Sequence, residues 1–167
     1  MFQGPFRRLV NAAAREGYRL AYLALRVWWS VRRPRTCGAA VALWHAGEVL
    51  MVRTSYRGCY SLPGGFVRAG EPSEQAARRE LQEELGIRVP PRTLHHAWHG
   101  TIRFESRQDT IDIWEMAADP APEPRITGRE IVWADWVAPA DALKRPLLPH
   151  VATYLREVTG RLTPPCP

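Results

Sequence analysis

The feature that most constrains the fold of this chain is the stretch Gly65–Ile87, which predicts one amphipathic helix. Ala77, Leu81 and Leu85 are spaced by four residues, so they share one helical face that can be buried against a sheet. A proline at position 72 suits the first turn of a helix, and a glycine at position 86 suits its exit. We therefore expect a helix from about residue 72 to 85, packed on a sheet.

The opposite face of this helix carries three carboxylates. Glu80, Glu83 and Glu84 stand at positions i, i+3 and i+4, where side chains are neighbours. Three carboxylates packed that closely repel each other unless a cation lies among them, and hard oxygen ligands in this number favour Mg²⁺ or Mn²⁺ over zinc. Gly64 and Gly65 let the preceding loop approach closely, so a main-chain carbonyl can join the coordination sphere.

The whole stretch meets one spacing rule, G-x5-E-x7-R-E-U-x-E-E-x-G-U, in which U is an aliphatic residue. The matching positions are Gly65, Glu71, Arg79, Glu80, Leu81, Glu83, Glu84, Gly86 and Ile87. A chance match to the seven fixed identities has a frequency of about one in 10⁸, which argues against a solvated acidic helix. On these residues, and on the preceding YSLPGG loop, the chain resembles the Nudix hydrolase superfamily over about residues 36–160.

The resemblance implies an α+β fold, an α/β/α sandwich around a mixed sheet. It also implies divalent-metal dependence and hydrolysis of a nucleoside diphosphate linked to another group. By position, Glu80, Glu83 and Glu84 would bind the metal together with a carbonyl of Gly65 or its neighbour, and Glu80 or Glu84 would lie near the nucleophilic water. Arg79 and Glu71 would be a supporting pair.

Outside this stretch, the candidate site residues rest on weaker patterns. Many members of the family use a further glutamate from a later loop as ligand or base. Glu130 is the candidate here, and a surface acid is the equal alternative. Arg53 and Arg57 border the entrance loop and suit phosphate; Arg107 and Asp109 could reach a second phosphate or a sugar, or form a local salt bridge in a turn.

The remaining order of elements supports the same fold class. We expect two strands between residues 36 and 53, further strands near 94–104, 110–118 and 131–137, and a last helix near 149–159. Strands on both sides of a central helix predict a mixed sheet covered on both faces. The chain thus divides into an N-terminal basic amphipathic helix, residues 1–35, and a Nudix hydrolase domain, residues 36–167.

The N-terminal helix, expected over residues 6–33, has an arginine stripe opposite an apolar face. At about 100° per residue, the stripe falls within roughly 40° and contains Arg8, Arg15, Arg19, Arg26 and Arg33. A basic stripe, an apolar face and Trp28 are typical of a helix that lies on anionic lipid. The commoner alternative is a helix whose apolar face packs on its own domain or on a second subunit, as in a homodimer.

Composition limits the setting of the chain. The net charge of +6 comes almost wholly from arginine, since Lys144 is the one lysine. Three cysteines without CxxC spacing predict reduced thiols. Charged residues interrupt the N-terminal apolar stretch, so neither a signal peptide nor a membrane span is expected. We expect a cytoplasmic protein, peripheral at the inner membrane surface if the first helix is interfacial.

Three histidines cluster near residues 95–99, on a presumed strand. Alternation would place His95, His96 and His99 on different faces, and no fourth ligand is near in sequence, so they are not expected to bind zinc.

The function predicted by these patterns is Mg²⁺-dependent hydrolysis, with Mn²⁺ as an alternative metal, of a small nucleoside diphosphate derivative. A nucleotide sugar, an ADP-ribose-like compound or a nucleoside triphosphate would be such a substrate. Removal of pyrophosphate from an RNA 5′ end is an alternative, but no aromatic-plus-basic RNA motif supports a nucleic-acid partner. A non-catalytic nucleotide-sensing domain is a third interpretation, which the intact glutamates disfavour.

Overall fold

The computed structural model describes residues 5–162, and it describes side chains from residue 9 to residue 160. Its elements are α1 (Pro5–Arg32), β1 (Arg35–His45), β2 (Glu48–Thr54), β3 (Tyr60–Ser61), β4 (Gly64–Phe66), α2 (Ser73–Leu85), β5 (His95–Phe104), β6 (Arg107–Ala117), β7 (Ile131–Val137), α3 (Pro139–Ala142) and α4 (Pro149–Leu162). The predicted helices and strands agree with these bounds to within a few residues. The strand β6 begins three residues earlier than expected, so Arg107 and Asp109 lie on a strand, directly after the turn at residues 105 and 106. The short elements β3, β4 and α3 were not predicted.

The strands form one mixed sheet with β1 at its centre. Their order is β3-β2-β1-β6-β5, while β4 also pairs with β1 and β7 pairs with β2. β1 and β6 are parallel, from Arg35 opposite Gln108 to Trp44 opposite Ala117, and all other pairs are antiparallel. Residues 39–43 of β1 are buried on both faces, as expected for a strand covered on both sides.

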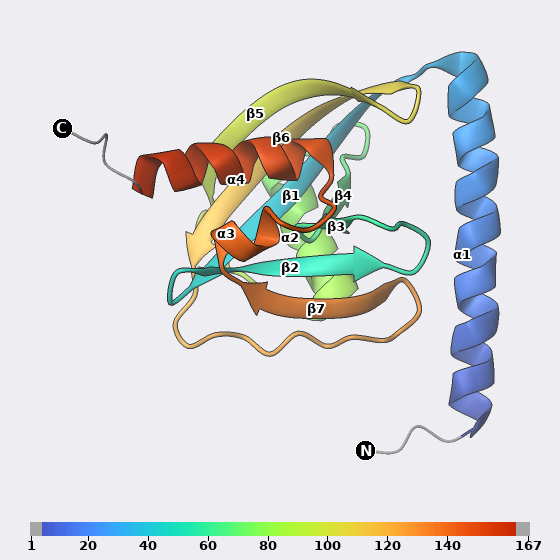
Figure 1. The fold of residues 1–167 in the computed structure, drawn as a ribbon, viewed down its shortest axis with the longest axis horizontal. Helices are drawn as coiled ribbons and strands as arrows, with labels where there is room; N and C mark the ends of the chain where they lie inside the picture. The colour runs from blue at the N-terminus through green and yellow to red at the C-terminus, as the bar shows by residue number, and fades with distance from the viewer. Residues whose placement is uncertain (1–4, 163–167) are drawn as a thin grey trace.

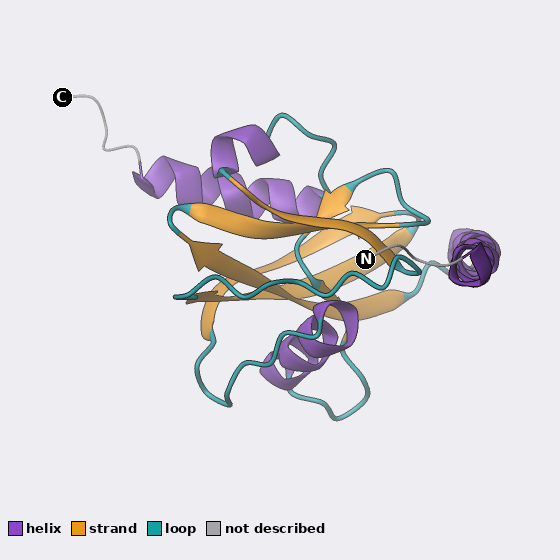
Figure 2. Cartoon of the chain, turned by 90° about the horizontal axis from the view of Figure 1, so that it is seen from below, coloured by secondary structure: helices purple, strands orange, loops and turns teal. Residues whose placement is uncertain are grey.

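Helices cover the two faces of this sheet, and Figures 1 and 2 show α2 on one side and α3 and α4 on the other. Leu81 and Leu85 of α2 are fully buried against one face, in the cluster that contains Val41 and Val52. Tyr154 and Leu155 of α4 are buried in the cluster on the opposite face. The predicted α/β/α sandwich with a mixed sheet is therefore confirmed.

The first helix, α1, stands beside the sandwich rather than within it (Figures 1 and 2). Its inner side touches the segments around residues 55–57, 105–107 and 127–129. Among the described residues, no helix is both long and apolar enough to cross a membrane.

Candidate active site

Two glycines shape the segment that leads into α2: a side chain at position 64 would collide with the backbone of β1, and one at position 65 would displace the carboxylate of Glu80. A Cβ on Gly64 would lie 2.3 Å from the carbonyl oxygen of Ala39, on the neighbouring strand β1. A Cβ on Gly65 would lie 2.6 Å from the carboxylate of Glu80. The glycines thus let the backbone of β4 lie directly against both the central strand and a carboxylate of α2.

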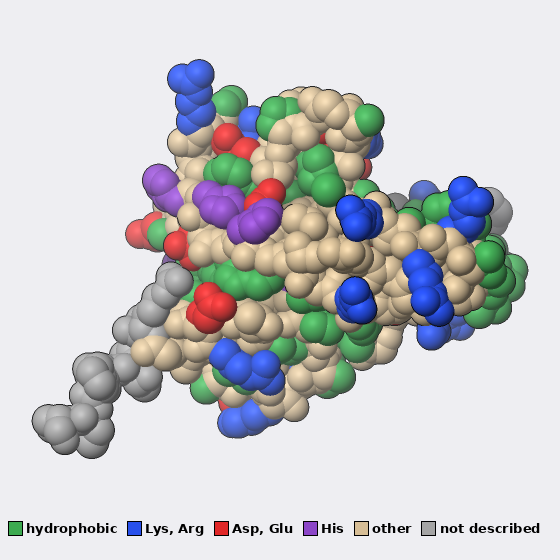
Figure 3. Space-filling model, turned by 90° about the horizontal axis from the view of Figure 1, so that it is seen from above, with side chains coloured by type: hydrophobic (Ala, Val, Ile, Leu, Met, Phe, Trp, Pro, Cys, Tyr) green, Lys and Arg blue, Asp and Glu red, His purple; other side chains and the backbone are tan. Residues whose placement is uncertain are grey.

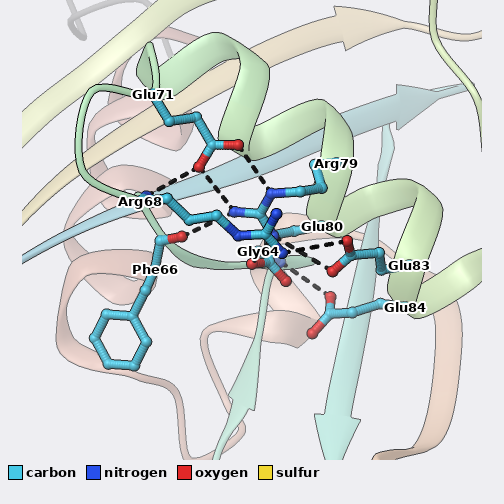
Figure 4. A network of polar contacts seen from close by, with 8 residues as sticks. All are labelled: Gly64, Phe66, Arg68, Glu71, Arg79, Glu80, Glu83 and Glu84. Atoms are coloured by element: carbon cyan, nitrogen blue, oxygen red, sulfur yellow. Dashed lines mark hydrogen bonds and ion pairs between the residues drawn. The ribbon is translucent and has the colours of Figure 1, made fainter.

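Arg79 holds this loop against α2, as Figure 4 shows. Its Nε and Nη2 donate to the two oxygens of Glu71 at 2.9 and 3.0 Å, and Nη2 also donates to the carbonyl of Phe66 at 3.0 Å. The hydrogen bonds from Arg79, joined by the backbone N–H of Arg68, lower the pKa of Glu71 to about 2. The predicted pairing of Arg79 with Glu71 is confirmed as a contact.

Arg79 also reaches the carboxylates of α2 itself. Its Nη1 lies 2.6 Å from Oε1 of Glu80 and 3.4 Å from Oε2 of Glu83. One guanidinium therefore joins the loop acid Glu71 to two of the three helix acids, and it fixes where their carboxylates lie.

Glu84 is the most deeply buried of the three helix acids, and Figure 4 shows it beside Gly64. Burial raises its pKa well above the usual range, and repulsion by Glu130, Glu80 and Glu83 adds to that effect. The backbone N–H of Gly64 donates to Oε2 of Glu84 at 3.0 Å and opposes the shift. Burial also raises the pKa of Glu80, although the hydrogen bond and charge of Arg79 act against it.

Glu130 lies beside the three glutamates of α2, although it follows Glu84 by 46 positions in the sequence. It precedes β7 and lines the same cavity as the three helix glutamates. The hydroxyl of Tyr56 donates to its Oε1 at 3.0 Å. Burial, followed by the nearby charge of Glu130, keeps the pKa of Tyr56 well above the usual range, so the phenol remains a neutral donor.

These carboxylates lie on one cavity of about 400 Å³, the usual size for a small-molecule site. Its wall includes Glu80, Glu83, Glu84, Glu130, Arg57, Arg107, Asp109, Tyr56 and His150. Arg53, the fourth residue that the sequence proposed for substrate, is not part of that wall; its guanidinium lies 5.8 Å from the ring centroid of Tyr60.

Arg107 is a buried cation held by aromatic and acidic partners. Its guanidinium lies 3.9 Å from the ring centroid of Trp29 in α1, and its Nε donates to Asp109 at 2.6 Å. Asp109 also accepts a hydrogen bond from Thr36. The Nη1 atom of Arg107 is buried and has no hydrogen-bond partner within the described residues.

Arg57 is fixed in a similar way by α1. Its Nε donates to the hydroxyl of Tyr22 at 3.0 Å, and its Nη2 lies 3.6 Å from Glu105, to which the same hydroxyl donates. Together with Arg107 it makes the surroundings of His150 cationic. Burial first, and then these two positive charges, lower the pKa of His150 to about 4, so the imidazole is neutral at pH 7.

Three residues of this site were missed by sequence reasoning: Tyr56, His150 and Trp29. Neither Tyr56 nor His150 belongs to a sequence pattern that indicates a role for it. Trp29 was assigned only to a helix outside the hydrolase domain, and its contact with Arg107 joins positions 78 residues apart.

The expectation that strand alternation separates His96 from His99 is wrong. A β-bulge between His96 and Trp98 breaks the alternation, so that His96 and His99 both lie on Asp112, at 2.9 and 2.7 Å. Their three ligand atoms lie within 4.8 Å of one another. This cluster does not line the cavity of Glu80, Glu83 and Glu84.

Comparison with known proteins identifies the family. The family model for the NUDIX domain matches residues 34–158, most of the chain. The chain belongs to the Nudix family. The matched region begins after the last residue of α1.

Individual Nudix proteins match over smaller parts. An ADP-ribose pyrophosphatase of Methanocaldococcus jannaschii is 53% identical over 43 residues, 24% of this chain and 25% of that protein. An uncharacterised Nudix hydrolase of Pseudomonas aeruginosa is 34% identical over 59% of this chain and 60% of its own length. The chain thus spans less than two thirds of these curated relatives. The solved structure of a MutT Nudix hydrolase from Burkholderia pseudomallei has a TM-score of 0.66 at 26% identity, over 74% of this chain and 98% of that one.

Proposed function

We propose that this protein is a Mg²⁺-dependent pyrophosphohydrolase that cleaves the diphosphate linkage of a small nucleoside diphosphate derivative. One observation carries the proposal: the three glutamates of α2, Glu130 and the arginines at 57 and 107 line a single cavity. A site with carboxylates for a cation and guanidinium groups for phosphate is suited to a diphosphate.

The residues present fit a hard divalent cation. Besides burial, the charges of Glu83 and Glu130 raise the pKa of both Glu80 and Glu84; among the described residues, Arg79 opposes the shift of Glu80 and the backbone N–H of Gly64 opposes that of Glu84. Such a group of oxygens is stabilised by a cation and matches the preference of Mg²⁺ or Mn²⁺. Glu80, Glu83, Glu84 and the carbonyl of Gly65 would hold it. When bound, the metal would neutralise diphosphate oxygens and make a water more acidic.

The protein's own groups would then position the substrate and accept the proton. Glu84 and Glu130 share the cavity with the proposed cation site, so either carboxylate can take the proton from the attacking water. The hydroxyl of Tyr56 fixes one oxygen of Glu130 and thereby orients the carboxylate. Arg79 and Glu71 act through the loop, by holding the backbone of β4 against α2.

Arg57 and Arg107 are the proposed phosphate contacts on the other side of the site. Both are held in place by aromatic rings of α1, which reduces the entropy lost when they bind an anion. The free Nη1 of Arg107 and the Nδ1 of His150 are buried polar atoms of the cavity wall without a partner among the described residues. They are suited to hydrogen-bond the second phosphate or the sugar; Asp109 serves by orienting Arg107.

The volume of the cavity and the names of the relatives support this substrate class. A cavity of about 400 Å³ suits a nucleotide derivative, such as the ADP-ribose after which the archaeal relative is named. A second candidate is a capped RNA 5′ end, because an NAD-capped RNA hydrolase of Erwinia tasmaniensis is 32% identical over 71% of this chain and 43% of its own length.

The proposal is tested by measuring product release from a panel of substrates with Mg²⁺ and with excess chelator. The panel contains ADP-ribose, nucleotide sugars, nucleoside triphosphates and NAD-capped or triphosphate-ended RNA. We expect metal-dependent turnover of a small compound, and a loss of at least a hundredfold in Glu84→Gln but not in Glu74→Gln, an acid of the same helix outside the cavity. Binding without turnover would identify a sensing domain and contradict the proposal.

A further inference from the structure

The helix α1 is amphipathic, but its apolar face points away from its own domain. Leu9, Leu20, Val27 and Val31 fall within roughly 40° of one another around the helix, nearly opposite to Trp29. Their exposed fractions are 70%, 68%, 60% and 76%, whereas Trp29 is 3% exposed. Hydrophobic side chains accordingly gather on the outer edge of this helix in Figure 3.

The inner face of α1 is polar and aromatic. Asn11 and Arg15 donate to the carbonyls of Thr127 and Gly128, and Tyr22 is hydrogen-bonded to Arg57. These contacts fix the rotation of the helix about its axis. The commoner alternative from sequence was packing of the apolar face on its own domain or on a second subunit. Packing on its own domain is wrong, so this face is open to another partner.

The charges beside the apolar face indicate what that partner is. Arg19 and Arg26 lie along one border and Arg32 lies near the other, and all three are exposed. Glu16 is the one acid of the helix, and it is paired with Arg19 at 2.5 Å. A partner that contacts both borders must be anionic. A second copy of this helix would instead bring its own Arg26 and Arg32, which have no ion-pair partner among the described residues, against these.

The width of the apolar face supports the same partner. From Leu23 to Trp28 the exposed apolar arc spans about 140°, which is broader than the narrow seam of a two-helix coiled coil. Trp28, 50% exposed, lies at the border of that arc, where an indole suits the boundary between lipid chains and headgroups. Arginine side chains at the borders can extend their charge to headgroups while their stems remain on apolar surface.

We propose that α1 is an interfacial helix: its outer face lies on an anionic phospholipid surface, while its inner face holds Arg57 and Arg107 of the cavity wall. Through Arg57 and Arg107, the same helix would place that cavity beside the membrane. This inference rests on the orientation of α1 and does not depend on the proposed hydrolysis.

The test is co-sedimentation of the full-length protein with vesicles of phosphatidylcholine alone or mixed with phosphatidylglycerol. We expect binding to the mixed vesicles, weakened by salt, and little binding to phosphatidylcholine alone. Leu20→Gln combined with Val27→Gln should lower the partition coefficient at least tenfold without changing the net charge. Ser30→Gln, a matched change of an exposed residue outside the apolar face, should leave it unchanged.

Arg26→Gln combined with Arg32→Gln should lower partitioning to mixed vesicles about tenfold. This variant should then bind both vesicle types similarly weakly. Circular dichroism melts and light scattering on every variant verify that the fold is intact and report the oligomeric state. Equal binding by the Leu20/Val27 double variant, or no binding to mixed vesicles, would overturn the proposal. So would a dimer that this double variant dissociates.

Discussion

The helices α2 and α1 are both amphipathic and both serve the same cavity, but they orient their apolar faces in opposite directions. α2 buries its apolar face, so Leu81 is inaccessible, and turns its carboxylates to the cavity. α1 turns its polar and aromatic face to the domain and leaves Leu20 exposed. The difference shows that an apolar stripe predicts that a surface will be covered, but it does not predict by what.

The two helices also serve the site differently. α2 supplies Glu80, Glu83 and Glu84 directly to the cavity wall. α1 is not part of that wall; it acts through Arg57 and Arg107, which it holds with Tyr22 and Trp29. The site thus has an acidic side encoded in one continuous motif and a basic side assembled from distant segments.

The largest expected effect concerns the two apolar faces. Leu81→Ala should lower the free energy of unfolding by about 2–5 kcal/mol, because it removes a fully buried side chain from a packed core. Leu20→Ala, the same change on α1, should alter it by less than about 0.5 kcal/mol in the absence of lipid. Denaturant titrations measure both, and a large loss in Leu20→Ala would show that its face is already covered in solution.

The next effect tests the basic side of the cavity through His150. Its folded pKa of about 4 lies below the 6.5 of an unfolded histidine, so the unfolded state takes up a proton first as the pH falls. The contribution of His150 to the free energy of unfolding should therefore be fully present above pH 6.5. The free energy of unfolding should decrease by up to about 3 kcal/mol between pH 6.5 and pH 4.

His150→Gln removes this titration, so its stability should depend less on pH across the same range. The comparison of the two proteins by denaturation at a series of pH values isolates the contribution of His150. Parallel curves would mean that His150 is not held neutral by burial beside Arg57 and Arg107.

Glu130→Gln tests whether the acidic side extends beyond the motif. We expect turnover to fall at least tenfold, with an unchanged melting temperature, because Glu130 shares the cavity with the glutamates of α2. Glu123→Gln, an exposed acid of the preceding loop, is the matched control. Unchanged turnover in Glu130→Gln would restrict the catalytic carboxylates to α2.

The smallest effect concerns the action of α1 through Arg57. Tyr22→Phe removes the hydroxyl that accepts from Arg57 and donates to Glu105, so Arg57 should be less well positioned. We expect KM to rise about threefold while kcat stays within a factor of two, since a uniform binding interaction is weakened. Tyr18→Phe is the control on the same helix. A matching fall in kcat with unchanged KM would contradict a role in substrate binding.

The acidic side was predictable from sequence because its residues are close in the chain. Periodicity placed Glu80, Glu83 and Glu84 on one face of a helix whose other face had to be buried, and the glycine loop followed from the same motif. For Glu130, a role as ligand or base and a role as a surface acid were equal alternatives. Whether this residue lies beside the glutamates of α2 depends on the path of the 119–130 loop, which the sequence does not give.

The basic side was less predictable because its contacts are made between segments that are distant in sequence. Arg57 and Arg107 were named on charge alone, while Arg53, equally plausible from sequence, lies outside the cavity wall. The direction in which α1 faces depends on the contacts of Tyr22 and Trp29 with these arginines, which no periodicity reveals. The bulge that gathers His96 and His99 on Asp112 was likewise invisible, because alternation assumes a regular strand.

The central claim is that the acidic face of α2 holds a divalent cation in this cavity. It is tested most directly by titrating Mn²⁺, observed by electron paramagnetic resonance, into the wild-type protein and a Glu80→Gln/Glu84→Gln double variant, with Leu20→Gln as the control on α1. The account predicts saturable Mn²⁺ binding to the wild type and to Leu20→Gln, competed by Mg²⁺ and at least a hundredfold weaker in the double variant. Equal binding of Mn²⁺ by the double variant would contradict it.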